Sequence, residues 1–566
     1  MADRSVTPPP LHGPSAKEKK YDRQLRLWAA SGQAALEGAH LLLINAGSGV
    51  IGIETLKNLV LPGIGHFMIV DPAIVQEEDL AVNFFLDETS LGKSRAEQTC
   101  NFLKELNPDV EGHFLSEPLE TFVTRPDALT PYSHILVASP VDPQILLAVS
   151  EHAQRTHTPV FYLHCVGFYA HFSLYLPPAF PIIDTHPDPN STTDLRLVKP
   201  WPALSEFAAQ KTENLESVSD HEHGHVSYVL LLLHYLEMWK ETHDGKIPST
   251  YKEKNEFREL VRAGMRTDNA EGSEENYEEA IAAVLKSLND PSPGSAVKDV
   301  LNAPECKDLS SQSANVWVIA NAISQFYQKH GVLPLSGSVP DMKAQSADYI
   351  QLQNVYKSKA RQDIEEVLRT VRSLEGQLHR PSPVEPSEVE AFCKNAGHIK
   401  LVRGRPFHVI RPDVKLVWGD RAKFAANALT DDSSLMLLYI AFLAYDEFCA
   451  THSANLHLSA PQPPGVRNVD VDEEKLTGIT YKIISSLLKE AGITLEDSEY
   501  DQVKERVGDI CAEMARAGGA ELHNIAALAG GLVAQEVIKI ITKQYIPVDN
   551  ACLFDGIRSV SAVLRL

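Results

Sequence analysis

Residues 41–52 read LLLINAGSGVIG and carry the strongest structural signal in the chain. The apolar run is typical of a buried strand, and Gly47, Gly49 and Gly52 follow it in a G-x-G-x-x-G pattern. Glycines so spaced permit a tight turn and a close approach of backbone to phosphate, and the N-terminus of the following helix supplies N–H donors. The stretch therefore predicts a strand–turn–helix unit that can cradle a nucleotide.

A second apolar run, residues 67–70, ends at Asp71, where the acidic residue that binds a ribose is expected. Helical patterns at 53–60 and 94–106 alternate with strands. Four strands are expected in this region, at residues 41–44, 67–70, 134–138 and 160–163. Alternating strands and helices predict an α/β fold with a parallel, doubly wound sheet.

The middle of the chain is different, because helical periodicity dominates from residue 183 to residue 507. Helices are expected at 226–241, 251–263, 276–288, 314–330 and 348–379. The α/β pattern returns near the end, with a helix at 525–543 and strands at 551–554 and 560–566. We therefore expect one α/β domain built from residues 19–182 and 508–566, with residues 183–507 as a mainly helical inserted domain. Residues 1–18 are Pro-rich and polar and predict a disordered tail.

Composition narrows the classes of partner. The 566 residues include 52 Lys and Arg against 75 Asp and Glu, which gives a net charge of −23. Such an acidic protein is a poor ligand for nucleic acid or for an anionic membrane. We expect neither as a partner.

The seven cysteines are scattered without a C-x-x-C pair, so neither a disulfide framework nor a zinc site is indicated. The first residues lack the apolar core of a signal peptide. The longest apolar runs, at 226–236 and 525–534, are too short to span a bilayer. These features predict a cytoplasmic or nuclear location, or both.

Several motifs resemble those of the ubiquitin-like-protein activating enzymes. They are YDRQLRLW at 21–28, LPGIG at 61–65, LGKSRA at 91–96 and EVIKIITKQ at 536–544. TYKEK at 250–254, VPDM at 339–342 and LQNVY at 352–356 resemble, more narrowly, the regulatory subunits of neddylation activating enzymes. The resemblance extends from about residue 18 to residue 566. It implies a ThiF/MoeB-like, Rossmann-type adenylation domain.

The chain departs from the active members of that family at the residues that would handle phosphate. Ala81 and Val82 stand where active members carry an asparagine and an arginine, and Arg95 replaces the second lysine of a Gly-Lys-x-Lys motif. The metal-binding aspartate is displaced by one position, to Asp142. Losing one preorganised charge can cost roughly 3–4 kcal/mol of transition-state stabilisation. The resemblance therefore implies an inactive, pseudo-adenylation domain in which Gly47, Gly49, Gly52 and Asp71 are a relic of nucleotide binding.

The resemblance also implies a division of labour between two chains. The partner subunit would hold ATP, Mg²⁺ and the catalytic cysteine, and this chain would hold no cofactor and no metal. Together they would activate a ubiquitin-like modifier of cullins and pass it to a conjugating enzyme. Arg23 would contribute in trans to the partner's ATP site. The residues expected to face the partner are Asp341, Met342, Tyr349, Leu352, Gln353 and Asn354.

Three alternatives stay open on sequence alone. The chain could be a self-sufficient adenylating enzyme that uses its glycines and Asp71, a nucleotide-binding oxidoreductase, or a scaffold unrelated to protein modification. A histidine cluster, His221, His223, His225 and His234, has no confirming ligand pattern. We interpret it as a solvated start of a helix in preference to a metal site.

Overall fold

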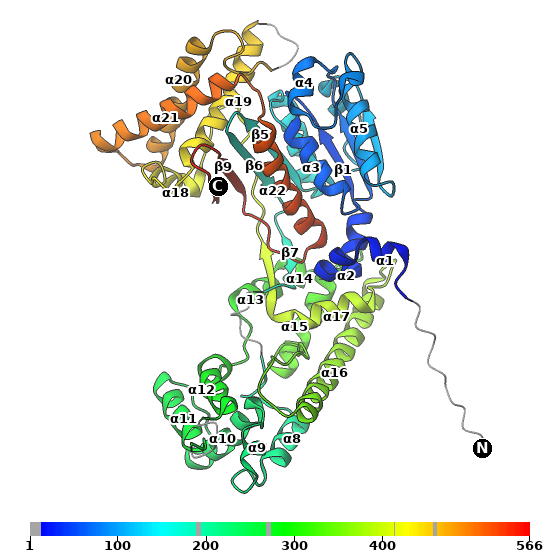
Figure 1. Ribbon diagram of the computed structural model, residues 1–566, viewed down its shortest axis with the longest axis vertical. Coiled ribbons are helices and arrows are strands. Elements are labelled where there is room, and N and C mark those ends of the chain that lie inside the picture. Colours follow the sequence, from blue (N-terminus) through cyan, green and yellow to red (C-terminus); the bar gives the residue numbers. More distant parts are fainter. Residues whose placement is uncertain (1–12, 188–193, 268–272, 412–413, 457–460) are drawn as a thin grey trace, which may run out of the picture. The chain divides into compact units, whose positions relative to one another are not determined.

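The computed structural model describes residues 13–187, 194–267, 273–411, 414–456 and 461–566. The chain divides into two compact units. Unit 1 comprises Met1–Phe180 and Val402–Leu566, and unit 2 comprises Pro181–Leu401 (Figure 1). The first expected boundary, at residue 182, lies close to the observed one. The second, at residue 507, does not.

Unit 1 contains, within the described residues, an eight-stranded sheet in the order β10-β9-β6-β5-β4-β1-β2-β3. Its strands are β1 (His40–Ile44), β2 (His66–Val70), β3 (Glu111–Leu115), β4 (His134–Ala138), β5 (Val160–Val166), β6 (Tyr169–Tyr175), β9 (Ala551–Asp555) and β10 (Val560–Leu564). The first five strands are parallel. Strands β6, β9 and β10 pair antiparallel. The expected parallel sheet is therefore confirmed for one half, and antiparallel strands extend it.

Helices cover both faces of this sheet because successive strand residues point to opposite sides. Leu42 and Ile44 pack in one cluster with Ile145, on the face covered by α6 (Leu119–Val123) and α7 (Pro143–Thr156). Leu43 points the other way, where a Cβ on Gly52 would lie 2.7 Å from its Cδ1 atom. The helices of that face are α3 (Val50–Val60), α5 (Arg95–Leu106) and α22 (His523–Thr542). The fold class expected from sequence is thus the observed one.

The remaining helical segments of unit 1 complete its α/β half. They are α1 (Ala16–Lys20), α2 (Asp22–Glu37), α4 (Glu77–Val82) and the 3₁₀ turn η1 (Glu88–Ser90). The expected disordered tail, residues 1–18, lies mostly outside the described residues, but its end is helical. A reciprocal capping box between Ser15 and Glu18 begins α1, and this S-x-x-E pattern is a helix-start signal in the sequence.

Residues 402–507 belong to unit 1 and not to the inserted unit, which corrects the expected boundary at residue 507. Their helices are η3 (Gly419–Arg421), α18 (Ala422–Asn427), α19 (Met436–Leu456), α20 (Val469–Ala491) and α21 (Asp497–Ala517). Apolar residues of α19 share one buried cluster with Tyr169 of β6 and Leu553 of β9. The physical reason is that α19 is apolar on nearly every side, and such a helix must be buried all round.

Helix α22 is the one described helix that is long and apolar enough to cross a membrane by length and composition. It has 20 residues, more than the apolar run at 525–534 suggested. However, 56% of its most apolar 18-residue stretch is buried inside the protein. Gly530 lies against α3, where a Cβ would come within 2.8 Å of Glu54 Cβ. We interpret α22 as a core helix of the sheet.

Unit 2 is helical and is connected to unit 1 by a pair of short strands, β7 (Phe180–Ile183) and β8 (Ile399–Val402). Its helices are α8 (Pro202–Thr212), α9 (Asp220–His223), α10 (Tyr228–Thr242), α11 (Tyr251–Ala263), α12 (Glu275–Ser287), α13 (Ser295–Asn302), α14 (Pro304–Lys307), α15 (Asn315–His330), α16 (Ser346–Leu378), α17 (Pro386–Lys394) and the turn η2 (Ala396–His398). Every helix expected between residues 226 and 379 is present. Their apolar stripes meet in one buried cluster that includes Tyr277, Leu352 and Tyr356.

Candidate functional site: a filled glycine loop and an exposed arginine

The glycine loop has the backbone geometry that its sequence predicts. Gly47 and Gly49 have φ angles of 56° and 66°, in the left-handed region that favours glycine. A Cβ on Gly49 would overlap the side-chain amide of Asn45. The turn therefore delivers the chain directly from β1 into the N-terminus of α3, where free N–H groups can bind an anion.

A carboxylate of the chain itself lies at this N-terminus. Glu521 is 2% exposed, and its Oε2 atom accepts a hydrogen bond of 2.7 Å from the backbone N–H of Ile51. The backbone N–H groups of Gly49 and Val50 also favour the charged form of this carboxyl group, because they lower its pKa. Burial raises the pKa of Glu521 to about 7, and these backbone N–H groups oppose the rise. The donors that would hold a nucleotide phosphate are thus engaged by a side chain.

Asp71, the expected ribose ligand, is engaged as well. Arg95 Nε donates to Asp71 Oδ2 over 2.8 Å, and Arg95 Nη1 donates to Asp79 Oδ1 over 3.0 Å. The other Asp71 contacts come from Asn45 Nδ2 and the Ala73 N–H, each at 2.9 Å. Burial lowers the pKa of Arg95, but the carboxylates of Asp71 and Asp79 raise it by more. The pKa of Arg95 therefore stays above the usual value of an arginine.

Arg95 also contacts the glycine loop. Its Nη2 atom donates to the carbonyl oxygen of Gly47 over 2.8 Å. The residue that departs from the lysine of active family members therefore points inward and makes a buried ion network. It is not placed as a free cation that could neutralise the phosphates of a substrate.

The other departures from the active pattern have structural roles or none. Asp142 accepts the Gln144 N–H over 2.8 Å and caps α7, and Ala81 and Val82 end the short helix α4. Among the described residues, no group of three or more His, Cys, Asp or Glu side chains could hold a metal ion. All seven cysteines are buried and free. Burial raises the pKa of the Cys165 thiol well above its usual value, which disfavours the reactive thiolate.

Comparison with known proteins agrees with this geometry. The ThiF family model matches residues 21–559. The NEDD8-activating enzyme E1 regulatory subunit of Xenopus laevis is 34% identical over 97% of this chain and 99% of its own length. The subunit of that name in Danio rerio is 35% identical over 98% and 99%. This chain belongs to that family of ThiF-type regulatory subunits.

The resemblance extends beyond animals. The NEDD8-activating enzyme E1 regulatory subunit AXR1 of Arabidopsis thaliana is 34% identical over 97% of this chain and 96% of its own length. Among solved structures, E. coli MccB with ATP matches at a TM-score of 0.25 and 19% identity, over 28% of this chain and 48% of that chain. The PaaA structure matches at 0.26 and 16%, over 31% and 55%. These structural matches span about half of each solved chain and define no function.

Arg23, the residue for which the family implies a role in trans, is exposed in the first turn of α2. No hydrogen bond or ion pair to Arg23 is found within the described residues. Its neighbour Tyr21 is 2% exposed, and the Tyr21 hydroxyl accepts the Asn107 Nδ2–H over 3.0 Å. A Cβ on Gly63 would lie 2.7 Å from that hydroxyl, so Tyr21 fits tightly. The buried Tyr21 therefore fixes the backbone from which the exposed Arg23 side chain projects.

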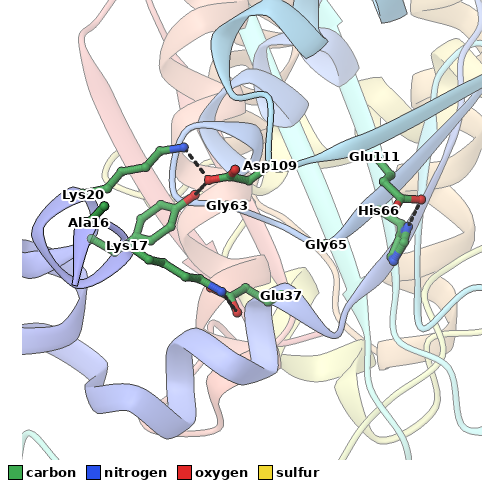
Figure 2. A pocket seen from close by; sticks show the side chains of 10 residues that line it. Ala16, Lys17, Lys20, Glu37, Gly63, Gly65, His66, Asp109 and Glu111 are labelled. Atoms are coloured by element: carbon green, nitrogen blue, oxygen red, sulfur yellow. Dashed lines mark hydrogen bonds and ion pairs between the residues drawn. The ribbon is translucent and has the colours of Figure 1, made fainter.

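Ion pairs attach the preceding helix, α1, to the end of α2 and to the loop before β3. Figure 2 shows Lys20 reaching Asp109 and Lys17 reaching Glu37, at 2.7 and 2.8 Å. Lys20 Nζ also donates to Asn107 Oδ1 over 2.6 Å. These groups line a cavity of about 620 Å³ near the start of β2. Every cation in this cavity already has an acidic partner, so the contacts anchor α1 and do not form an anion site.

The residues expected to face a partner from unit 2 fall into two groups. Asp341 and Asn354 are exposed, and Met342, Tyr349 and Gln353 are half-buried. Leu352 is 0% exposed and lies in the core of unit 2, so its assignment to an interface is wrong. The exposed apolar residue of this helix is Ile350, which shares a face with Asn354 at i, i+4 spacing. Sequence periodicity could have separated the buried from the exposed side.

The histidine cluster also needs a correction. His223 is buried, with Nδ1 2.7 Å from Glu274 Oε1 and Nε2 3.1 Å from the Tyr277 hydroxyl. It therefore belongs to a polar network inside unit 2 and not to a solvated helix start. His221 and His225 fit the original interpretation better, since His221 is exposed, His225 is only half-buried, and their rings stack 4.3 Å apart.

Proposed function

We propose that this chain is the regulatory, non-adenylating subunit of a NEDD8-activating enzyme and acts together with an adenylating subunit. One observation carries the proposal: in a chain similar over its whole length to such subunits, the glycine loop and Asp71 are engaged by Glu521 and Arg95. The alternative of a self-sufficient adenylating enzyme has no support, because the groups it needs are already bonded.

In this proposal the partner subunit binds ATP and Mg²⁺ and carries the nucleophilic cysteine. The modifier's C-terminal carboxylate attacks the α-phosphate there and releases pyrophosphate, and the cysteine then takes over the acyl group and releases AMP. That chemistry needs fixed positive charge near the phosphates. This chain supplies the second half of the α/β pair and, through Arg23, one cation.

A surface of unit 1 fits the adenylating subunit as its occupant. Helices α3 and α22 lie side by side (Figure 1), and part of the apolar helix α22 stays unburied. Leu528 of α22 is 45% exposed. Phe84 is 79% exposed, and its ring stacks 6.2 Å from that of His523 at the start of α22. Exposed apolar patches of this kind mark protein interfaces. We call Phe84 and His523 the α22 patch.

Arg23 suits a contribution in trans. A guanidinium stays charged at any relevant pH and can contact two phosphate oxygens at once. The anchored Tyr21 reduces the entropy lost when Arg23 takes up one position, because the backbone beneath it is already ordered. An arginine supplied by one chain to the phosphates of another is a known catalytic device.

The test compares the purified full chain with the reconstituted pair. Alone, the chain should catalyse no ATP–pyrophosphate exchange and form no thioester with the modifier, and both activities should appear on adding the adenylating subunit. Exchange or thioester formation by the lone chain would contradict the proposal. So would full activity of the adenylating subunit without this chain.

A further inference from the structure

Glu521 reaches the glycine loop from the far end of the chain, 470 residues from Ile51. It lies in the short link between α21 and α22, where Gly518 and Gly519 have φ angles of 58° and 80°. This link is tied down on two sides. Gly167 N–H donates to the Ala520 carbonyl over 2.9 Å, and Ser48 Oγ donates to the Gly519 carbonyl over 3.3 Å. The carboxylate is therefore held in place by its backbone.

The position of that carboxylate is the one an anionic ligand would take. The first N–H groups of a helix have no partner within the helix, and the helix dipole adds positive potential there. In this chain the N–H group of Ile51 bonds to Glu521, and the neighbouring N–H groups of Gly49 and Val50 also favour the charged form of its carboxyl group, because they lower its pKa. A phosphate and the Glu521 carboxylate would compete for the same donors, so both cannot be bound together.

Arg95 completes the closure from the other side of the loop. It donates to the Gly47 carbonyl and pairs with both Asp71 and Asp79. The Glu521 carboxylate thus accepts a hydrogen bond from a backbone N–H of the loop region, and the Arg95 guanidinium donates one to a loop carbonyl. Both come from side chains that are at least nine-tenths buried.

We propose that Glu521 is a built-in substitute for phosphate, which occupies the anion position of the glycine loop, closes it to nucleotide and stabilises the start of α3. In this proposal the nucleotide position is filled by the Glu521 side chain and serves to hold the fold together, in place of a vacant relic site. This inference goes beyond the regulatory role proposed above and depends neither on Arg23 nor on the partner subunit.

The experiment removes the carboxylate and offers the loop an external anion. Inorganic phosphate is titrated into the full-length wild-type chain and into Glu521→Ala, with thermal unfolding and calorimetry as readouts. We expect the variant to bind phosphate at least about tenfold more tightly than the wild type, and its lowered Tm to rise with phosphate. The Tm of the wild type should change with phosphate no more than it changes with chloride at the same ionic strength.

Glu513→Ala is the matched control, because Glu513 is another buried carboxylate of unit 1 that accepts a backbone N–H, that of Phe168, over 3.1 Å. Its loss should create no phosphate site. If Glu521→Ala does not fold in chloride buffer, it is refolded with added phosphate, which should restore folded protein where matched chloride does not.

Two results would overturn the inference. One is saturable binding of phosphate or ATP to the wild-type chain as tight as to the Glu521 variants. The other is a folded Glu521 variant that responds to phosphate no more than Glu513→Ala does. Neither result bears on whether the chain stimulates an adenylating partner, so the two proposals fail separately.

Discussion

Arg95 and Arg23 are two arginines of the same unit with opposite surroundings. Arg95 is buried and bonded to Asp71, Asp79 and a loop carbonyl, whereas Arg23 is exposed on an anchored helix start. In the function proposed above, this difference separates a structural role of positive charge from a role toward a partner chain. The positive charge inside the pocket has become part of the structure, and a positive charge outside it is available to a partner.

The largest expected effect tests the buried side of this comparison. Arg95→Ala should destabilise the chain by roughly 3–5 kcal/mol, because it leaves two buried carboxylates without their partner. Thermal or chemical unfolding measures the loss. Arg125→Ala, which removes an exposed ion pair with Glu117, is the control and should change stability little. Equal stability of both variants would show that the Arg95 network is not structural.

Arg23→Ala tests the exposed side. It should leave folding and assembly unchanged and lower the rate of adenylate formation by the reconstituted pair roughly 10²–10³-fold, if the guanidinium contacts developing charge. ATP–pyrophosphate exchange measures the rate, and analytical centrifugation confirms assembly. Arg26→Ala is the control, since Arg26 is exposed nearby but pairs with Asp22 over 2.9 Å. A neutral Arg23→Ala would remove the role in trans.

The titration of Glu521 sharpens the comparison further. Its pKa rises from 4.5 to about 7 on folding, so folding favours the protonated form. The stabilisation is complete below pH 4.5 and is lost as the pH rises to about 7, by at most about 1.4 kcal/mol for each pKa unit. The Tm of the wild type relative to Glu521→Gln should therefore fall over this range and level off above it. A Tm difference that stays constant with pH contradicts the shift.

The smallest expected effect concerns the α22 patch. Phe84→Ala should not alter the stability of the lone chain, because the ring is 79% exposed. It should weaken binding of the adenylating subunit by about tenfold, the loss typical of a moderate interface anchor. Calorimetric titration measures the affinity. Tyr251→Ala is the control, an aromatic residue of unit 2 that is 71% exposed; an equal loss there would argue against a specific patch.

Much of the fold could be predicted because its signals are local. The strand, glycine turn and helix at residues 41–60, and the helices of unit 2, follow from hydrophobic periodicity and turn chemistry within short windows. The departure of Arg95 from the lysine of active family members could also be noticed, through the resemblance to the activating enzymes. Strands β3 and β6 were missed because polar residues interrupt their apolar pattern, as in EGHFL and YAHFSLY.

What replaced the lost chemistry could not be inferred. Nothing near Glu521 in the sequence marks it as a ligand of the glycine loop, since the two are brought together only by the packing of α22 on α3. The burial of His223 and Leu352 depends in the same way on which side of a helix meets another helix.

The sequence by itself determined the strand–turn–helix unit at residues 41–60, the left-handed turn at Gly47 and Gly49 and the main helices of unit 2, because each depends on a few neighbouring side chains. Only the tertiary structure decided that residues 402–507 belong with the sheet and that Glu521 and Arg95 fill the loop. Those outcomes arise from contacts between segments that are distant in the sequence. Which apolar surfaces and which paired charges are buried depends on how all elements of the unit pack together.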